Sequence, residues 1–484
     1  MKVALIYPPF RKGKEFPLLS QNRQFKFSKS LEVRIYPVVM ATFATMLKQA
    51  GHEVLFLDGI NARMSMEKFE QKLFTFKPDV VVLETKTPIM QTIWAYTDRL
   101  KRETKASVVL VGDHVSFFPG ESIEKSKADF VITGGDYDFV GTELVDCIAK
   151  KRKTAQYPKG VWWKKGNSGK TKFHDLAGLP RIDRDLTNWK LYGEAYLYRP
   201  VAYILSGRGC GRSDDAPGVC SFCVWQHALW NCTHRLRPAA EVVDEIKHLV
   251  EDYGVKEVFD DNESGFLYSE SYTEQFYNEM VRANLIGKVK ISMNARAEAL
   301  TDKVCMLMKK MGGRLLKIGV ESGNGATLER IQKKETTAEI EAGIRKAKDY
   351  NLRVLLTNMV GYPWETEEEV KISYERLKRL MFYKIRFGDS LQASIVVPYP
   401  GTPLYREAVK NKWFLISPKD YEKFDMSVDV LKSPIDTTMW CRKFWSIQTH
   451  PLYLLRSFLS IRSFADIKVA VRGLFSLIGH LRDY

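Results

Sequence analysis

The first 150 residues alternate short apolar segments with longer amphipathic ones. Apolar runs of strand length lie at residues 3–7, 53–57, 80–83, 108–111 and 130–132. Between them, apolar positions recur with helical spacing over 38–49, 66–76, 90–103, 121–125 and 141–151. Strands that alternate with helices are typical of a parallel sheet covered on both faces. We therefore predict a doubly wound α/β domain over residues 1–150, with its ligand site beyond the carboxyl ends of the strands.

The same alternation returns between residues 201 and 412. Predicted strands lie at 202–205, 257–260, 289–292, 315–318, 354–358 and 392–396, with helices between them. About six such units predict a partial or complete βα barrel, whose functional residues lie on the loops after the strands. Residues 151–200 are predicted to be a connector without a core of its own, with an exposed hairpin at 164–172.

The pattern changes again over residues 413–484. Residues 441–484 contain seven Lys or Arg and two Asp or Glu, and they interleave these charges with Trp445, Phe458, Phe464 and Phe475. Such a pattern predicts a basic, amphipathic helical region. Two interpretations stay open at this point: helices packed on the barrel with solvated arginines, or attachment to a membrane surface or an acyl-rich substrate.

Composition narrows the class of protein without fixing it. The chain has 484 residues, 45% of them hydrophobic and 27% charged, which excludes wholesale disorder, collagen and coiled coil. Its formal net charge of +16 would attract phosphates, nucleic acid or an anionic membrane surface. The charge alone does not indicate which of these the protein binds. The start MKVALIYPPF does not read as a signal peptide, and no apolar run is long enough to span a bilayer. We expect a cytoplasmic protein.

Four of the seven cysteines fall between residues 210 and 232, which favours a metal centre over a disulfide framework. Cys210, Cys220 and Cys223 follow the first strand of the second domain. Three thiolates on one loop can hold three irons of a cubane cluster and leave the fourth iron open for a ligand. Cys220 and Cys223 could instead join His227 and Cys232 in a tetrahedral zinc site.

This loop resembles that of the radical S-adenosylmethionine (SAM) enzymes, which carry C-x3-C-x2-C after the first barrel strand. Here the spacing is C-x9-C-x2-C, and the six additional residues are loop-like. A longer loop costs little entropy to close, so the resemblance holds. It implies that Cys210, Cys220 and Cys223 bind a [4Fe-4S] cluster.

Segments at the later strand ends resemble the SAM contacts of the same family. From their charges, Asp260 or Asp261 could accept a hydrogen bond from the SAM ammonium, Arg296 could pair with its carboxylate, and Glu321 could bind the amine or the ribose. Surface salt bridges are the alternative role for Asp260 and Arg296. The residues with an implied SAM-binding role are Asp261, Asn262, Asn294, Arg296, Glu321 and Gly361.

Polar and glycine residues also lie at the ends of three predicted strands of the first domain: Glu84-Thr85, Gly112-Asp113-His114 and Gly134-Gly135. The G-x-G-x-x-G fingerprint is absent after the first strand, which counts against a dinucleotide. A five-unit domain ahead of such a barrel resembles the cobalamin-binding radical SAM enzymes, among them hopanoid methylases and the anaerobic magnesium-protoporphyrin cyclase. The resemblance implies cobalamin at these strand ends. D-x-H-x-x-G is absent from the domain, so His114 is interpreted as a residue lining the cofactor or as a structural histidine.

The resemblance also implies a reaction. A reduced cluster would cleave SAM to a 5′-deoxyadenosyl radical, which would abstract hydrogen from an unactivated carbon, and methylcobalamin could then donate a methyl group. The expected substrate is a small molecule, lipid-like or a tetrapyrrole, and the expected partner is an electron donor such as flavodoxin or ferredoxin.

The alternatives are cyclisation or rearrangement without methyl transfer, and a zinc-containing interaction protein without enzymatic activity. A further alternative is modification of tRNA. The methylthiotransferase relatives carry three further N-terminal cysteines for a second cluster, whereas only Cys147 precedes Cys210 here. Nucleic acid is therefore disfavoured as a substrate.

Overall fold

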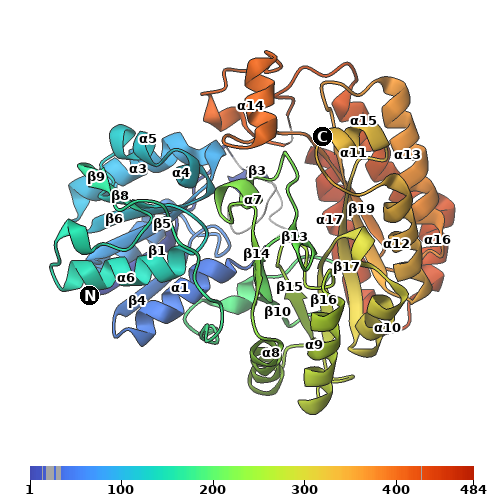
Figure 1. Ribbon diagram of the computed structural model, residues 1–484, viewed down its shortest axis with the longest axis horizontal. Helices are drawn as coiled ribbons and strands as arrows, with labels where there is room; N and C mark the ends of the chain where they lie inside the picture. Colours follow the sequence, from blue (N-terminus) through green and yellow to red (C-terminus); the bar gives the residue numbers. More distant parts are fainter. Residues whose placement is uncertain (14, 18–26, 29–33, 427, 484) are drawn as a thin grey trace.

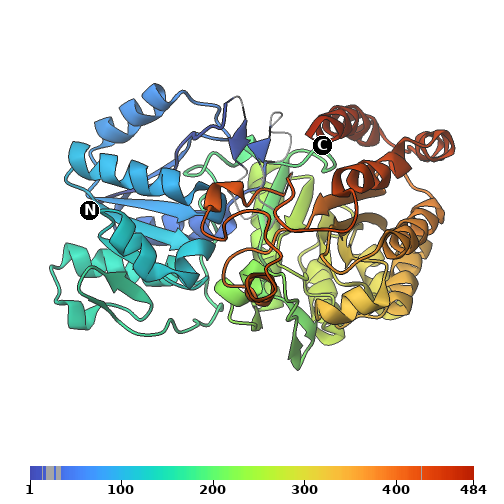
Figure 2. The ribbon, with the colours of Figure 1, turned by 90° about the horizontal axis from the view of Figure 1, so that it is seen from above.

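The computed structural model describes residues 1–13, 15–17, 27–28, 34–426 and 428–483, with side chains described as far as residue 473. An N-terminal domain, blue to cyan, lies beside a barrel domain, green to orange, and the C-terminal helices pack against the barrel (Figures 1 and 2). The doubly wound first domain and the partial barrel are therefore confirmed.

The N-terminal domain contains a seven-stranded sheet in the order β4-β1-β5-β6-β7-β8-β9. The five strands from β4 to β7 are parallel, and their Val, Leu and Ile side chains are almost completely buried, apart from Val54 and Leu55 on β4. The strands are β1 (Lys2–Tyr7), β4 (Glu53–Asp58), β5 (Val80–Thr85), β6 (Ser107–Gly112), β7 (Phe130–Ile132), β8 (Val161–Trp163) and β9 (Gly166–Asn167). The helices are α1 (Val38–Gln49), α2 (Met66–Phe76), α3 (Met90–Glu103), α4 (Asp113–Phe117), α5 (Pro119–Lys125) and α6 (Tyr137–Ala149).

Local chemistry accounts for the helix limits. Before α2, the Ser65 side chain accepts a hydrogen bond from the backbone N–H of Lys68, and Lys77 ends the helix in the left-handed region at φ 54°. Phe69 and Leu73, one turn apart, are buried against the sheet. The predicted bounds of α1, α2 and α3 match the observed bounds.

Residues 151–200, predicted to be a connector, contribute to both domains. β8 and β9 form a hairpin that extends the N-terminal sheet, because Val161 and Trp162 pair antiparallel with the last parallel strand. The chain then crosses to the barrel. On the way the Arg184 side chain, 1% exposed, donates hydrogen bonds to the carbonyl of Tyr203 and to Glu245. The connector thus contributes to the core.

The second domain is a six-stranded parallel sheet whose strands follow one another in chain order, which gives a partial barrel. The strands are β10 (Val201–Ile204), β15 (Glu257–Asp260), β16 (Lys290–Ala295), β17 (Gly313–Glu321), β18 (Arg353–Val360) and β19 (Ser390–Ile395). The helices that connect them are α8 (Ala239–Tyr253), α9 (Glu270–Arg282), α10 (Asp302–Lys310), α11 (Gly325–Arg330), α12 (Thr337–Asp349) and α13 (Glu367–Phe382); α14 (Pro403–Lys410) follows the last strand.

The C-terminal region is only partly helical as predicted. Residues 413–426 and 428–436 form mainly irregular chain that returns to the N-terminal domain, where the Tyr421 ring meets the His114 ring edge-on with centroids 4.7 Å apart. Next, α15 (Thr437–Ser446) packs on β19, and the Trp445 indole N–H donates to the Ala393 carbonyl. The chain ends with α16 (Pro451–Leu459) and α17 (Phe464–Asp483). Within the described residues, no helix is both long and apolar enough to cross a membrane.

Candidate functional site

A cavity of about 1310 Å³, part of it open to solvent, lies at the carboxyl ends of the barrel strands. Cys210, Cys220 and Cys223 all line it. The three cysteines predicted to bind a cluster therefore share one space at the end of the barrel where its function is expected.

The structure explains the long interval between the first two cysteines. Residues 211–217 turn back as a small hairpin, β12 (Gly211–Ser213) and β13 (Ala216–Pro217). The Gly218 backbone N–H then donates to the Cys210 carbonyl over 2.8 Å. The hairpin therefore projects from the cysteine loop without lengthening it. Cys210 lies beside Gly218, and Gly218 precedes Cys220 by two residues.

A short helix fixes this arrangement. In α7 (Val224–Ala228), the buried Gln226 amide donates to the carbonyls of Cys210 and Gly218 over 3.2 and 2.9 Å. A Cβ on Gly218 would lie 2.6 Å from the Cys210 sulfur, which leaves no room there for any side chain.

The four-residue zinc set is divided by the structure. Cys220 and Cys223 line the cavity, whereas His227 and Cys232 do not. The Cys232 sulfur lies 3.3 Å from Nδ1 of His227, and Nε2 of His227 lies 3.2 Å from the Cys220 carbonyl. Both imidazole nitrogens therefore already have partners within the protein. No three His, Cys, Asp or Glu side chains of the described residues group as a site for a single ion.

Three cysteines around an open cavity fit a cubane cluster better than a single ion, because a cluster holds its thiolate ligands on separate irons. The surroundings are cationic. Burial raises the pKa of the Cys220 thiol, and the charges of Lys333 and Arg296 oppose this shift. Such cations would stabilise thiolates.

Four of the six predicted SAM-binding residues line the same cavity: Asp261, Asn294, Arg296 and Glu321. Asn262 and Gly361 do not. The Asn262 amide donates to Ser206 and to the Gly265 carbonyl, and a Cβ on Gly361 would meet Thr437 at 2.8 Å. These two residues support the loops from behind.

Asp260 is also behind the cavity. It accepts hydrogen bonds from the backbone N–H and the hydroxyl of Ser206, and burial raises its pKa to about 6. Of the two aspartates considered for the SAM ammonium, only Asp261 lines the cavity.

Glu321 lies in the left-handed region at φ 66°, which is costly for a residue with a side chain and marks a constrained position. A Cβ on Gly319 would lie 2.2 Å from its carboxylate oxygen. Gly319 therefore keeps the space in which this carboxylate lies.

Several lining residues were missed from the sequence. Arg296 pairs with Glu335 over 3.2 Å, and Lys333 pairs with the same carboxylate over 3.1 Å, all three side chains being nearly buried. Lys333 and Glu335 follow helix α11, and the ion pair between Glu335 and Arg296 joins loops about forty residues apart, so no local pattern signals it. Further lining residues missed from the sequence include Gln226, Glu263, Lys317, Thr357 and Ser394.

The seven residues predicted to bind cobalamin lie at the carboxyl edge of the N-terminal sheet, and none lines the large cavity. Buried Asp113 pairs with Lys86 over 3.0 Å, and buried Glu84 accepts from Tyr7 and Tyr137. His114 is 1% exposed, and its Nδ1 lies 3.1 Å from the Thr87 hydroxyl.

The glycines of this edge permit close packing. A Cβ on Gly112 would lie 2.6 Å from the Thr85 carbonyl, and one on Gly134 would lie 2.9 Å from Thr171. A Cβ on Gly135 would lie 2.1 Å from the Trp230 ring. The edge therefore faces the barrel domain, and most of its polar groups have protein partners, although Oδ1 of buried Asp113 has no hydrogen-bond partner among the described residues. The roles of these residues in binding a corrin stay a prediction.

α7 lies between this edge and the cavity. It contacts α4 on one side, and its Trp225 lines the cavity while the ammonium of Lys86 lies 5.2 Å from the Trp225 ring centroid. The edge and the cavity are thus separated by a single short helix.

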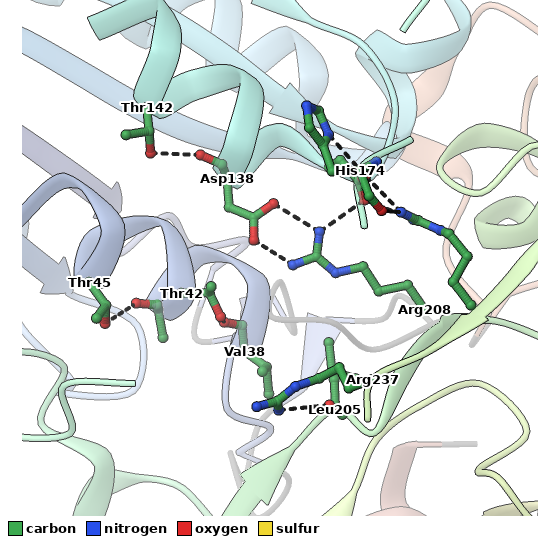
Figure 3. Close-up of polar contacts among 12 residues, drawn as sticks. Val38, Thr42, Thr45, Asp138, Thr142, His174, Leu205, Arg208 and Arg237 are labelled. Carbon is green, nitrogen blue, oxygen red and sulfur yellow. Dashed lines mark hydrogen bonds and ion pairs between the residues drawn. The ribbon is translucent and has the colours of Figure 1, made fainter. Parts of the chain in front are cut away.

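A buried network of charges joins the two domains just before the first cysteine (Figure 3). Arg208 on β11 (Gly207–Gly209) forms a two-pronged ion pair with Asp138 and a further bond of 2.9 Å to Asp136. The Arg235 guanidinium donates hydrogen bonds to both carboxylate oxygens of Asp136. The backbone N–H of His174 donates to one of these oxygens.

Burial alone would raise the pKa of Asp136. The hydrogen bonds from His174 and Arg235 and the charge of Arg208 outweigh this effect and hold the pKa well below its usual range. The side chains of Arg208, Asp136 and Asp138 are at most 2% exposed. This network fixes β11, the strand directly before Cys210, against the N-terminal domain.

Comparisons with known families agree with this geometry. A family model described as the radical SAM superfamily matches residues 204–377, and one described as a B12 binding domain matches residues 29–140. The chain thus combines a radical SAM domain with a B12-binding domain.

Relatives match over most of the chain. An uncharacterized methyltransferase of Pyrococcus horikoshii is 24% identical over 90% of this chain and 93% of its own length. The anaerobic magnesium-protoporphyrin IX monomethyl ester cyclase of Cereibacter sphaeroides is 27% identical over 82% of this chain and 63% of its own length.

Among solved structures, the radical SAM methyltransferase TsrM of Kitasatospora setae, with cobalamin and a [4Fe-4S] cluster bound, superposes with a TM-score of 0.69. It is 16% identical, and the match covers 100% of this chain and 99% of TsrM. The cobalamin-dependent enzyme OxsB gives a TM-score of 0.70 at 13% identity over 99% of this chain and 71% of OxsB. Both structures share the fold over nearly the whole of this chain.

The chain therefore has the domain combination of the cobalamin-dependent radical SAM enzymes. The matched domains imply the cofactors predicted from the sequence: a [4Fe-4S] cluster, SAM and cobalamin.

Proposed function

We propose that this enzyme transfers a methyl group to an unactivated carbon of a largely apolar small molecule. The observation that carries the proposal is the cavity, in which three cysteines meet a polar wall and an apolar wall from different elements. When bound, the cluster supplies an electron for cleaving SAM and cobalamin supplies a transferable methyl group.

The polar wall comes from the ends of β15, β16 and β17. Asp261 and Glu321 offer carboxylates to the ammonium and hydroxyl groups of SAM, and Arg296 offers a guanidinium to its carboxylate. Because Arg296 is nearly buried and also pairs with Glu298, its position is fixed before SAM arrives.

The apolar wall comes from α7, the end of β19 and the chain after it. Its main members are Phe222, Val224, Trp225, Ile395, Val397, Tyr399 and Met426. An apolar wall excludes water and binds a molecule with few polar groups, such as a lipid or a tetrapyrrole.

A second reaction is favoured by one observation. The relative from Cereibacter sphaeroides is a cyclase, and cyclisation or rearrangement without methyl transfer would use the same cavity. The two reactions differ in their products, since only methyl transfer consumes a second SAM and yields S-adenosylhomocysteine.

Two expectations about the setting follow. A one-electron protein donor such as flavodoxin or ferredoxin would reduce the cluster, which needs an electron for every SAM cleaved. The seven cysteines are all free thiols in the structure, which suits a reducing compartment such as the cytoplasm.

The test compares two cysteines after anaerobic reconstitution. Cys220→Ala should lose the visible absorbance of the cluster and all cleavage of SAM, because the cavity loses a ligand. Cys232→Ala is the matched control, and it should keep about four irons per chain and full cleavage.

Full cleavage by Cys220→Ala would refute the cluster assignment, and zinc without sulfide in the unmodified protein would favour an interaction protein. Corrinoid content tests the cobalamin proposal separately. Products labelled from methyl-labelled SAM distinguish methyl transfer from cyclisation.

A further inference from the structure

The two C-terminal helices carry a concentration of exposed apolar side chains. Sixteen large hydrophobic residues are exposed among the described part of the chain, and half of them fall within residues 452–471. Phe458 and Phe464 are each 71% exposed, and Leu459 is 63% exposed. We name this set the C-terminal apolar surface: Leu452, Leu454, Leu455, Phe458, Leu459, Phe464, Ile467 and Val471. Scattered exposed hydrophobic residues are normal, but a run of this density marks a contact surface.

A cationic groove lies beside the C-terminal apolar surface. Its empty volume is about 990 Å³, open solvent included. Six cations line it, and none of its described lining residues is acidic: Arg199, Lys256, Lys288, Lys290, Lys468 and Arg472. Burial lowers the pKa of Arg472, and the neighbouring charge of Arg199 lowers it further.

One helix joins the two features. On α17, Ala465, Lys468 and Arg472 line the groove, whereas Phe464, Ile467 and Val471 are exposed. Each set has helical spacing of three and four residues, so the cationic and the apolar stripes run side by side along the helix. Figure 2 shows α16 and α17, in dark red, on the outside of the barrel domain.

We propose that this surface docks on an anionic lipid bilayer. The apolar stripe would enter the boundary between headgroups and acyl chains, and the groove would hold lipid phosphates. A stripe of large apolar side chains next to a lysine- and arginine-lined stripe is the pattern of helices that lie in a membrane interface. The carboxylate nearest the stripe, Asp466, is buried and paired with Arg353, so it does not oppose anionic lipid.

The position of the surface leaves the cavity accessible. Lys256 and Lys290 lie at the amino ends of β15 and β16, while the cavity opens at the carboxyl ends of the same strands. Docking therefore holds the enzyme at a membrane without covering the cysteine loop. The proposal does not depend on which reaction the cavity performs.

The test is co-sedimentation of the full-length protein with vesicles. Vesicles of phosphatidylcholine with one quarter phosphatidylglycerol should bind the protein at low salt, and high salt should weaken the binding steeply. Pure phosphatidylcholine should bind at least about tenfold more weakly, because the cations then have no partner.

Two sets of variants separate the contributions. Leu455→Glu with Phe458→Glu should reduce binding to the anionic vesicles by about tenfold or more. Lys288→Glu with Lys468→Glu should reduce it similarly and flatten the salt dependence. Ile372→Glu is the matched control, since Ile372 is 53% exposed on α13, and it should bind like the unmodified protein.

Melting temperatures near that of the unmodified protein show that the variants fold, as expected for exposed positions. The proposal fails if the unmodified protein does not sediment with anionic vesicles at low salt, or if the Leu455/Phe458 variant still binds fully. Binding of an acidic electron-donor protein in place of vesicles, lost in the lysine variant, would assign the surface to that protein and overturn the membrane proposal.

Discussion

Replacing Arg208 by Met tests whether the charge network between the domains stabilises the protein and positions the cysteine loop. The change leaves Asp138 without its ion-pair partner and leaves Asp136 with Arg235 and His174. All three carboxylate and guanidinium groups at the centre of the network are buried. Met has a similar length and fills much of the space that the Arg208 stem occupied.

The magnitude follows from burial. Removing one partner of a buried ion pair leaves an uncompensated charge and typically costs ~3–5 kcal/mol. The matched control is Arg181→Met, because Arg181 pairs with Asp244 and the two side chains are 49% and 52% exposed. An exposed pair contributes only ~0–1 kcal/mol. A double change that also replaces Asp138 by Leu should recover part of the loss, because no unpaired carboxylate then remains there.

The assay is equilibrium unfolding in urea, followed by tryptophan fluorescence, together with iron content after reconstitution. Trp230 reports directly, since the Arg208 guanidinium lies 5.9 Å from its ring centroid. We expect a lower unfolding midpoint and fewer irons per chain, because Arg208 precedes Cys210 by two residues. The expected loss of unfolding free energy in Arg208→Met is ~3–5 kcal/mol. A loss within ~1 kcal/mol of that in Arg181→Met would refute the stabilising role. Lower stability with full iron content would refute the positioning role.

Two further changes test the cavity, and a third tests a buried carboxyl group. Gly218→Ala should reduce cluster content while the fold is kept, because the new Cβ would lie 2.6 Å from the Cys210 sulfur; iron analysis and circular dichroism check this. Gly319→Ala should displace the Glu321 carboxylate and raise the KM for SAM about tenfold or more with iron content unchanged, as measured by SAM cleavage. Burial raises the pKa of Glu365 to about 7 in the folded protein, compared with about 4.3 when unfolded, so the uncharged carboxyl is favoured by folding. Stability should therefore fall by ~3 kcal/mol as pH rises from about 4.3 to 7, and urea midpoints of Glu365→Gln should lack this decline.

Regular periodicity made much of the fold predictable. The bounds of α1, α2 and α3 follow from apolar spacing that tertiary packing does not override. Residues 413–436 have no such period, so the sequence gives no sign that Tyr421 returns to the N-terminal domain. β8 was missed because it pairs with a strand thirty residues earlier, and no local pattern carries that information.

The candidate site was predictable to the level of strand ends and no further. Asp260, Asp261 and Asn262 are consecutive, yet only Asp261 lines the cavity. Asp260 is turned away from the cavity because it accepts hydrogen bonds from Ser206, which lies more than fifty residues earlier in the chain. The glycines of the N-terminal edge were identified, but their neighbours, such as Trp230, lie in another domain.

The contacts between the domains are concentrated on both sides of the cysteine loop. Arg208 anchors the chain just before Cys210, and Arg235 anchors it after the loop, both on Asp136. Between them, Trp230 packs on Gly135 and its indole donates to Glu263, which lines the cavity. The conformation of the loop therefore depends on the N-terminal domain as much as on the barrel. Since the loop holds the candidate cluster ligands, docking of the B12-binding domain and geometry of the cluster site are coupled through the same buried aspartate.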